Sequence, residues 1–329
     1  MNDRSLFNFI LVRLGQGALV IVLVSFLSFL LLYASPGDCL ADLQLNQSLS
    51  PEFIAQERAR RGLDRPFLEQ YGRWLFNLAQ GNLGRTCKDN APVFNLILQR
   101  AGNTLLFSVS ALIATWLIAI PTGIWAAVNR HNFIDRFIQL ISYLLQGFPA
   151  FVMVILLLIF AQTSGLFPVG GLRSLDYDDL NFWGKIADIA YHLALPVTAA
   201  FLIGFAGLQR LMRGNLLDVL QEDYIRTARA KGLPETKVIY VHALRNAVNP
   251  LVTLLGFQLA SLLSGAFITE LLFGLPGLGQ LLYEAVRQKD TNLAMAGFML
   301  GAIMLVLGNL IADILLKLVD PRIKLDDRG

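Results

Sequence analysis

The chain has 329 residues, of which 55% are hydrophobic and only 16% are charged, and its formal net charge is +3. Soluble domains average about 25% charged residues, so this chain has too few charged side chains to cover a soluble surface. Together with a mean hydropathy of +0.56, the composition excludes an ordinary soluble globular domain and indicates a membrane protein.

Six segments are apolar enough to cross a bilayer. A transmembrane helix needs about 20 apolar residues, because a peptide group in the hydrocarbon core has no water to bond. The fourth segment is the weakest of the six, since it contains His192 and Pro196. We therefore expect an all-α membrane protein with transmembrane helices at residues 14–34, 100–128, 138–162, 188–210, 246–270 and 290–316.

Lysine and arginine are distributed unevenly between the segments that connect the spans. The segments on the side of the two termini contain 15 of them, whereas the two short loops on the other side contain four. Because basic residues accumulate in cytoplasmic loops, we expect residues 1–13, 211–245 and 317–329 to be cytoplasmic. The first span also resembles a signal peptide, but its uncharged stretch exceeds the usual length of about 7 to 15 residues, so we expect an uncleaved helix.

Residues 35–99 form the one sizeable loop outside the membrane, on the extracytoplasmic side. Ser50 is a good N-cap, Pro51 suits a first helical turn, and Gly62 suits a helix end. A second helix is predicted over residues 66–81, because apolar residues recur there at helical spacing. These residues are Tyr71, Trp74, Leu75 and Leu78. We expect a small helical cap on the outer face of the membrane.

The chain has two cysteines, and both Cys39 and Cys87 lie in this loop. In an oxidising compartment they would be able to form a disulfide, which would stabilise the cap by about 3 to 4 kcal/mol in the chain-entropy model. The alternative is a pair of unrelated free thiols. The sequence favours neither.

The loop over residues 211–245 is polar and basic, unlike the spans around it. Apolar residues in and before it recur at helical spacing and predict a helix face. Gly232 tolerates the positive φ that ends a helix, and Pro234 suits the first turn of the next, so we expect two short helices joined by a tight bend. The residues of the apolar face are Leu217, Leu220, Tyr224 and Ala228.

This shape favours docking of another protein. Small residues at the helix tip would let a partner approach closely, and basic residues would offer it fixed charges. The small residues are Ala228, Ala230 and Gly232, and the basic ones are Arg226, Arg229 and Lys231. The alternative is an amphipathic helix lying on anionic lipid. Acidic neighbours, among them Glu222 and Glu235, weaken that alternative.

The run DYIRTARAKGL, residues 223–233, resembles the cytoplasmic loop of binding-protein-dependent ABC transporter permeases, in the dipeptide, oligopeptide and nickel branch. That loop carries a Glu-Ala-Ala pattern followed by three residues and a glycine. Aligned on Gly232, this chain has Arg226-Thr227-Ala228 there and lacks the glutamate. Further short matches cover nearly the whole chain, although Cys39 stands where the branch often has proline. They lie at residues 34–38, 62–64, 81–84, 275–279 and 320–322.

The resemblance implies a transport permease whose transmembrane domain spans residues 100–318. Such permeases sit in the bacterial inner membrane, pair with a second, similar permease, and receive substrate from an extracytoplasmic solute-binding protein. Two cytoplasmic ATPase subunits bind ATP and Mg²⁺ and move the docking loops. The residues implied in ATPase coupling are Asp223, Tyr224, Arg226, Thr227, Ala228, Arg229, Ala230, Lys231, Gly232 and Leu233.

Motifs for chemistry on this chain itself are missing. The sequence contains no Gly-x-x-x-x-Gly-Lys-[Ser/Thr] run to hold phosphates, no Gly-x-Ser-x-Gly motif, and no histidines or cysteines at metal-ligand spacing. We therefore expect a non-catalytic subunit without a cofactor, a metal or a nucleic-acid partner. Its immediate surroundings are the lipid bilayer and its protein partners.

A few residues in the spans are candidates for the substrate pathway. Gln146 and Pro149 lie beside a predicted kink in the third span. The kink either lines the pathway or serves only the packing of the helices. Kinks are predicted at Pro121 and Pro196 as well. Charge inside a bilayer is costly, so Glu270 and Asp313 either face the pathway or lie at the headgroup level, solvated or paired to Lys317. For these two residues we favour the headgroup level.

Two other classes of transporter compete with the permease interpretation. A secondary transporter usually shows an internal repeat, which is not evident here. A channel needs a re-entrant filter loop, and the glycine-rich residues 273–279 resemble one. For the substrate, peptides are the first choice, while nickel chelates, glutathione-like thiols and other small solutes remain open.

Overall fold

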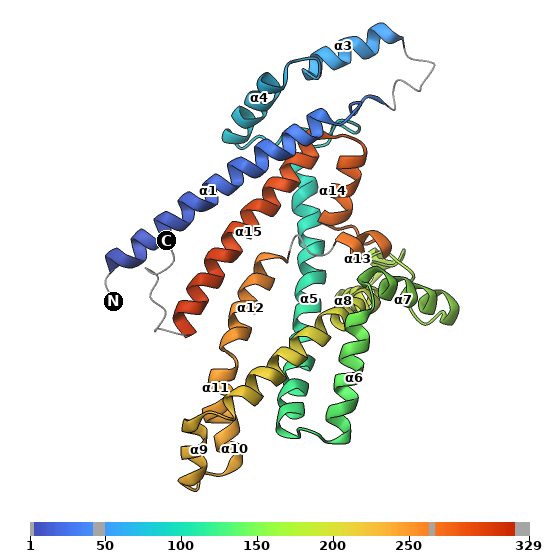
Figure 1. Cartoon of the computed structure of the whole chain (residues 1–329). Coiled ribbons are helices and arrows are strands. Elements are labelled where there is room, and N and C mark those ends of the chain that lie inside the picture. The colour runs from blue at the N-terminus through green and yellow to red at the C-terminus, as the bar shows by residue number, and fades with distance from the viewer. Residues whose placement is uncertain (1–2, 42–49, 263–266, 320–329) are drawn as a thin grey trace. The chain divides into compact units, whose positions relative to one another are not determined.

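A computed structural model describes residues 3–41, 50–262 and 267–319 of the chain (Figure 1). Regular structure within these ranges is helical, apart from an isolated antiparallel bridge between Arg85 and Pro92. The chain divides into two compact units. The first comprises residues 1–104 and 276–307, and the second comprises residues 105–275 and 308–329. The prediction of an all-α fold is confirmed.

Four described helices are long and apolar enough to cross a membrane. Two bent helix pairs raise the number to six if each pair counts as one span, which agrees with the six predicted spans. The four single helices contain the stretches Leu11–Ala34, Val93–Val128, Phe182–Val219 and Thr291–Ile311. The bent pairs are Phe133–Gly147 with Ala150–Ser164, at 101°, and Glu235–Ala247 with Asn249–Leu259, at 47°.

The first unit contains the cap together with helices from the beginning and from the last part of the chain. Ser50 caps the helix after it, because its hydroxyl accepts from the N–H of Phe53 at 3.2 Å, and Gly62 ends that helix at φ 70°. Both signals read from the sequence are confirmed. The helices are α1 (Asp3–Ala34), α3 (Pro51–Arg61), α4 (Phe67–Ala79), the start of α5 (Val93–Val128), α14 (Leu278–Arg287) and most of α15 (Thr291–Val319).

Helix α4 packs lengthwise against α1. Its Trp74 joins Phe29 of α1 in an apolar cluster with Met295 and Met299 of α15. The hydroxyls of Tyr71 and Ser25 are 2.9 Å apart, which adds a polar contact between the two helices. Tyr71, Trp74 and Leu78 of the predicted apolar stripe therefore belong to the face that fixes the cap to α1, whereas Leu75 is exposed.

The second unit holds most of the bundle and the loop over residues 211–245. Its larger core gathers small and aliphatic side chains, with Met212, Leu216 and Val238 fully buried. The helices are the remainder of α5, α6 (Phe133–Gly147), α7 (Ala150–Ser164), α8 (Phe182–Val219), α9 (Asp223–Ala230), α10 (Glu235–Lys237), α11 (Leu244–Ala247), α12 (Asn249–Ala260) and α13 (Phe267–Leu272). Two short turns, η1 (Tyr177–Asp179) and the π-helical η2 (Val238–Ala243), complete it.

Several helices differ from the predicted spans in length or continuity. The expected kink at Pro149 is a full break, since α6 and α7 meet there at 101°. The predicted span at 246–270 is interrupted as well, because α12 ends at Ala260 and α13 begins at Phe267. Helix α8 extends beyond residues 188–210 at both ends, whereas Pro196 lies inside it without ending it.

Candidate functional site

The loop over residues 211–245 folds around the short helix α9. Helix α8 ends at Val219, the chain turns over residues 220–222, and α9 begins at Asp223. Asp223 lies in the first turn, where its negative charge suits the positive end of a helix. The prediction that Leu217, Leu220, Tyr224 and Ala228 form one face of a single helix is therefore wrong.

Two residues anchor α9 to the second unit. The side chain of Ile225 is fully buried and Ala228 is 8% exposed. They pack in the core that contains Leu216 of α8 and Val238 and Ala243 of η2. The prediction of Ala228 as a small residue at an open tip is wrong, because its methyl group faces inward. Ala230 and Gly232 are exposed as expected.

The bend after α9 has the geometry that the sequence predicts. Gly232 has φ 76°, a region that favours glycine. Its N–H donates to the carbonyl of Arg229 at 2.9 Å, and the N–H of Leu233 donates to that of Ala228 at 3.4 Å. Pro234 then precedes α10. The pair of helices around a glycine bend is confirmed.

An ion pair closes this bend. The guanidinium of Arg229 donates to the carboxylate of Glu235 at 2.6 and 3.1 Å. The hydrogen bonds from Arg229 hold the pKa of Glu235 below its ordinary value, and the carboxylate raises the pKa of Arg229. Arg229 therefore supports the loop's own structure, but its side chain is still 42% exposed, so its role as a charge offered to a partner stays a prediction.

The outer face of α9 remains open to a partner. The side chain of Arg226 is 70% exposed and its bond to Asp223 is long, at 3.4 Å. Thr227 and Lys231 are exposed as well. Tyr224 has a supporting role, because its hydroxyl accepts from the amide of Asn246 at 2.7 Å and so connects α9 to α11. The resulting surface is basic and rigidly supported from behind.

Two supports of this loop were missed by sequence reasoning. Ile225 is the one large aliphatic residue between positions 221 and 232, and a lone aliphatic side chain in a charged stretch is a signal of burial. The π-helical turn η2, which frequently marks functional segments, has no such signal in the sequence.

A buried ion pair near this loop was also missed. Arg213 of α8 donates to both oxygens of Asp135 in α6, at 2.8 and 2.9 Å. Asp135 additionally accepts from the N–H of His131 at 3.0 Å and its side chain is only 3% exposed. This arrangement fixes the corner between α5 and α6 to α8, a few turns before α9.

The candidate pathway residues lie on separate elements of the second unit. Gln146 is exposed near the end of α6 and accepts from Arg210, and Pro149 precedes α7 at the break. Glu270 is 1% exposed in α13, which contradicts a solvated carboxylate at that position. Asp313 is half-buried in α15, and the side chain of Lys317 falls outside the described residues.

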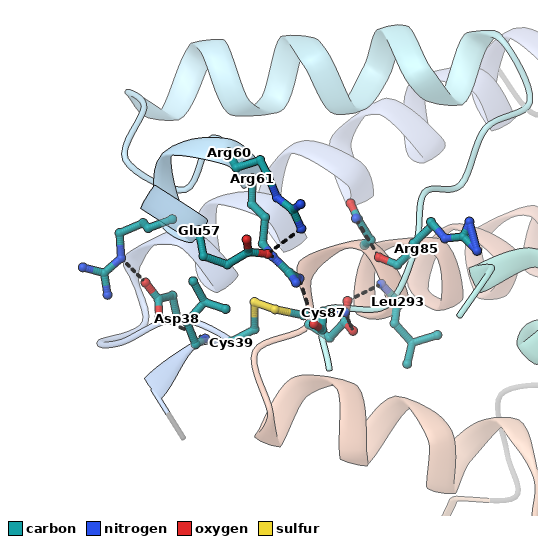
Figure 2. The surroundings of a disulfide bond; sticks show 12 residues. Asp38, Cys39, Glu57, Arg60, Arg61, Arg85, Cys87 and Leu293 are labelled. Atoms are coloured by element: carbon teal, nitrogen blue, oxygen red, sulfur yellow. Dashed lines mark hydrogen bonds and ion pairs between the residues drawn. A yellow bond between two sulfur atoms is a disulfide. The ribbon is translucent and has the colours of Figure 1, made fainter. Parts of the chain in front are cut away.

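In the first unit the structure joins Cys39 to Cys87 by a disulfide (Figure 2). Their Cα atoms are 6.1 Å apart across a sequence separation of 48 residues. Two further contacts hold Cys87: its N–H donates to Asp290 at 2.6 Å, and its carbonyl accepts from Arg61 at 2.8 Å.

The disulfide is directly testable by mass spectrometry. In protein purified without reductant we expect an alkylating reagent to modify neither Cys39 nor Cys87, because both sulfurs are bonded. After denaturation and reduction both residues are expected to react. A free thiol at either position in the unreduced, denatured protein would contradict the bond.

The fold and the loop define a multi-pass helical membrane protein with a braced, basic helix between two spans. Residues 119–325 match the family model "Binding-protein-dependent transport system inner membrane component", and residues 6–112 match the N-terminal model of the same kind of protein. The chain belongs to this family of inner membrane transport components. Membership agrees with a non-catalytic transport role and with a multi-pass location in the inner membrane.

Curated relatives match over nearly the full length. The oligopeptide transport system permease protein AppB of Bacillus subtilis is 38% identical over 306 residues, covering 92% of this chain and 94% of the relative. The dipeptide transport system permease protein DppB of Escherichia coli is 36% identical, covering 96% and 98%. The inward-facing MetNI methionine ABC transporter has a TM-score of 0.54 at 18% identity, covering 70% of this chain and 98% of that chain, which shows a similar fold.

Proposed function

We propose that this chain forms half of the translocation pathway of an ABC importer for di- or oligopeptides. The family match and the long alignments to an oligopeptide permease and a dipeptide permease support this proposal. A di/tripeptide permease of Pseudomonas aeruginosa, 35% identical over 96% of this chain, supports the same substrate class.

The α9 helix is the element through which ATP-driven motion enters the chain. The observation that carries this assignment is its mounting: Ile225 and Ala228 are buried in the core, whereas Arg226 on the opposite side is exposed. A helix anchored in this way transmits a push or pull to α8 and η2, which share its core. A loosely attached helix would absorb the motion instead.

The remaining partners follow from the same assignment. A second, similar permease completes the pathway, two cytoplasmic ATPase subunits bind ATP and Mg²⁺, and an extracytoplasmic solute-binding protein delivers the peptide. Both termini and α9 then lie in the cytoplasm, and the cap with its disulfide faces the oxidising side. Gln146, Pro149 and Glu270 are the proposed pathway residues on this chain.

Purification and transport assays test this function. We expect an affinity-tagged chain, extracted from its own membrane, to bring down an ATPase and a second permease. Proteoliposomes holding that complex are expected to accumulate a labelled dipeptide only when ATP and the solute-binding protein are supplied. Uptake by the chain alone without ATP would contradict the proposal in favour of a secondary transporter, and uptake of nickel chelates but no peptide would contradict the substrate class.

A further inference from the structure

A cavity of about 350 Å³ lies in the cap, a volume near the lower end of the range for ligand sites. Its lining comes from α3, α4, residues 85–90 and the start of α15, all in the first unit. The described residues that line it include four arginines and a single carboxylate. These charged residues are Arg60, Arg61, Arg73, Arg85 and Asp290.

The one carboxylate in the lining is already occupied. Asp290 accepts from the N–H of Cys87 at 2.6 Å and from that of Leu293 at 3.1 Å, and it is 5% exposed (Figure 2). It therefore fixes the backbone at Cys87 and Leu293. Its own negative charge offsets only part of the positive charge around the cavity.

Two glutamates outside the cavity lining pair with three of the arginines. Glu57 pairs with Arg60 and Arg61, and Glu69 pairs with Arg73 at 3.2 Å. Arg85 is different, because its Nε donates to the neutral carbonyl of Asn90 and no acidic partner lies within ion-pair distance among the described residues. Arg85 and the half-exposed Arg73 thus retain N–H groups for an anion.

A mostly apolar groove adjoins this cavity on the surface of α4, although Glu69 also lines it. Leu68 and Phe76 line it and are 73% and 65% exposed. Arg73 and Asn77 belong to the lining of both the groove and the cavity. A cationic cavity that leads into an apolar groove matches an amphiphile with an anionic head and hydrocarbon chains.

Helix α4 lies beside the outer end of the predicted first span. Phe67 and Tyr71 of α4 contact Phe26 and Phe29 of α1 with ring centroids 5.4 to 5.8 Å apart. Phe29 lies only about 8 Å along the axis from the end of α1 at Ala34, given a rise of about 1.5 Å per residue. The predicted first span ends at Ala34, so we expect both the cavity and the groove near the outer surface of the bilayer.

We propose that the cap binds a membrane phospholipid with an anionic headgroup. The headgroup phosphate accepts hydrogen bonds from Arg73 and Arg85 in the cavity, and the acyl chains lie along Leu68 and Phe76. Arginine suits this task because its planar guanidinium bonds two phosphate oxygens at once. The site depends on the membrane location of the chain and not on a peptide substrate.

Native mass spectrometry of the full-length chain tests the site. The protein is placed in nanodiscs of equal parts phosphatidylglycerol and phosphatidylcholine, and the phospholipid that stays bound after release is identified. We expect the wild type to retain phosphatidylglycerol preferentially. In the double variant Arg73→Gln, Arg85→Gln, retention should fall about fivefold for each arginine removed, from the usual contribution of a basic residue at an anionic surface.

Matched variants separate charge from folding. Arg65→Gln removes a cap arginine that also pairs with Glu69 but does not line the cavity, so it should retain lipid like the wild type. The double lysine variant of Arg73 and Arg85 keeps the charge and should retain most of the lipid. Leu68→Ser with Phe76→Ser should weaken retention of both lipids.

Three results would overturn the proposal. In the first, the wild type shows no preference for phosphatidylglycerol. In the second, the double glutamine variant retains as much phosphatidylglycerol as the wild type does. In the third, inorganic phosphate would bind the wild type in pure phosphatidylcholine nanodiscs with the same arginine dependence, while no phosphatidylglycerol is retained. That outcome identifies a site for the free anion instead of the lipid.

Discussion

Replacing Gly232 with valine is expected to abolish association with the ATPase while the chain still inserts into the membrane. Gly232 has φ 76°, where a β-branched residue is strained by roughly 1–3 kcal/mol. No atom lies within 4 Å of the position a Cβ would take, so the strain comes from the backbone and not from a collision. The chain relieves it by opening the bend, which separates Arg229 from Glu235 and reorients α9. Co-purification from membranes measures the loss of the ATPase.

Two variants control for effects other than backbone strain. Gly214→Val introduces the same side chain at a helical glycine with equally open surroundings and no positive φ, so ATPase binding should persist. Gly232→Asn is expected to retain part of the binding, because asparagine tolerates the left-handed region better than valine does. A Gly232→Val complex that assembles and transports normally would show that α9 is not the docking element.

The parts of this fold that were predictable from sequence are those set by neighbouring residues. The helix from Pro51 to Arg61 begins and ends as Ser50 and Gly62 indicate, because capping is a local interaction. The bend at Gly232 is local in the same sense. The positions of the spans were predictable because they depend on hydropathy summed over about 20 residues, so that a single polar residue does not change the prediction.

The prediction that continued one helix face across the break between α8 and α9 failed. Leu217 and Leu220 indicated which side of α9 would be buried, but the chain turns over residues 220–222 and the helical phase restarts. Ile225 is buried as a result, together with Ala228 of the predicted face, whereas Tyr224 of that face is 42% exposed. The pairing of Arg229 with Glu235, six residues later, was not predicted from the sequence either.

Contacts between distant segments left no signal in a single sequence. Asp290 bonds the N–H of Cys87 across 203 residues and Arg213 bonds Asp135 across 78. Glu270 was expected at the headgroup level, solvated or paired to Lys317, yet it is 1% exposed. In each case an acidic side chain is buried by tertiary packing that composition alone does not encode.

Replacing Arg213 with methionine is expected to destabilise the chain by about 3–5 kcal/mol. This is the usual cost of removing one member of a buried ion pair, because the other charge is left buried without a partner. The side chain of Asp135 is only 3% exposed, so its carboxylate would lose two charge-assisted hydrogen bonds and keep only the N–H of His131. Water has little access to replace them. Thermal unfolding of the purified chain in detergent, followed by circular dichroism, measures the loss.

A second substitution distinguishes the loss of an attraction from the burial of an uncompensated charge. Adding Asp135→Leu to Arg213→Met removes that charge, and most of the lost stability should return, since a pair of apolar residues often replaces a buried ion pair at little cost. Arg226→Met serves as the control, because its partner Asp223 is 96% exposed and such surface pairs contribute less than about 1 kcal/mol. If the double variant is as unstable as Arg213→Met alone, the packing of the arginine stem between α6 and α8 matters more than its charge.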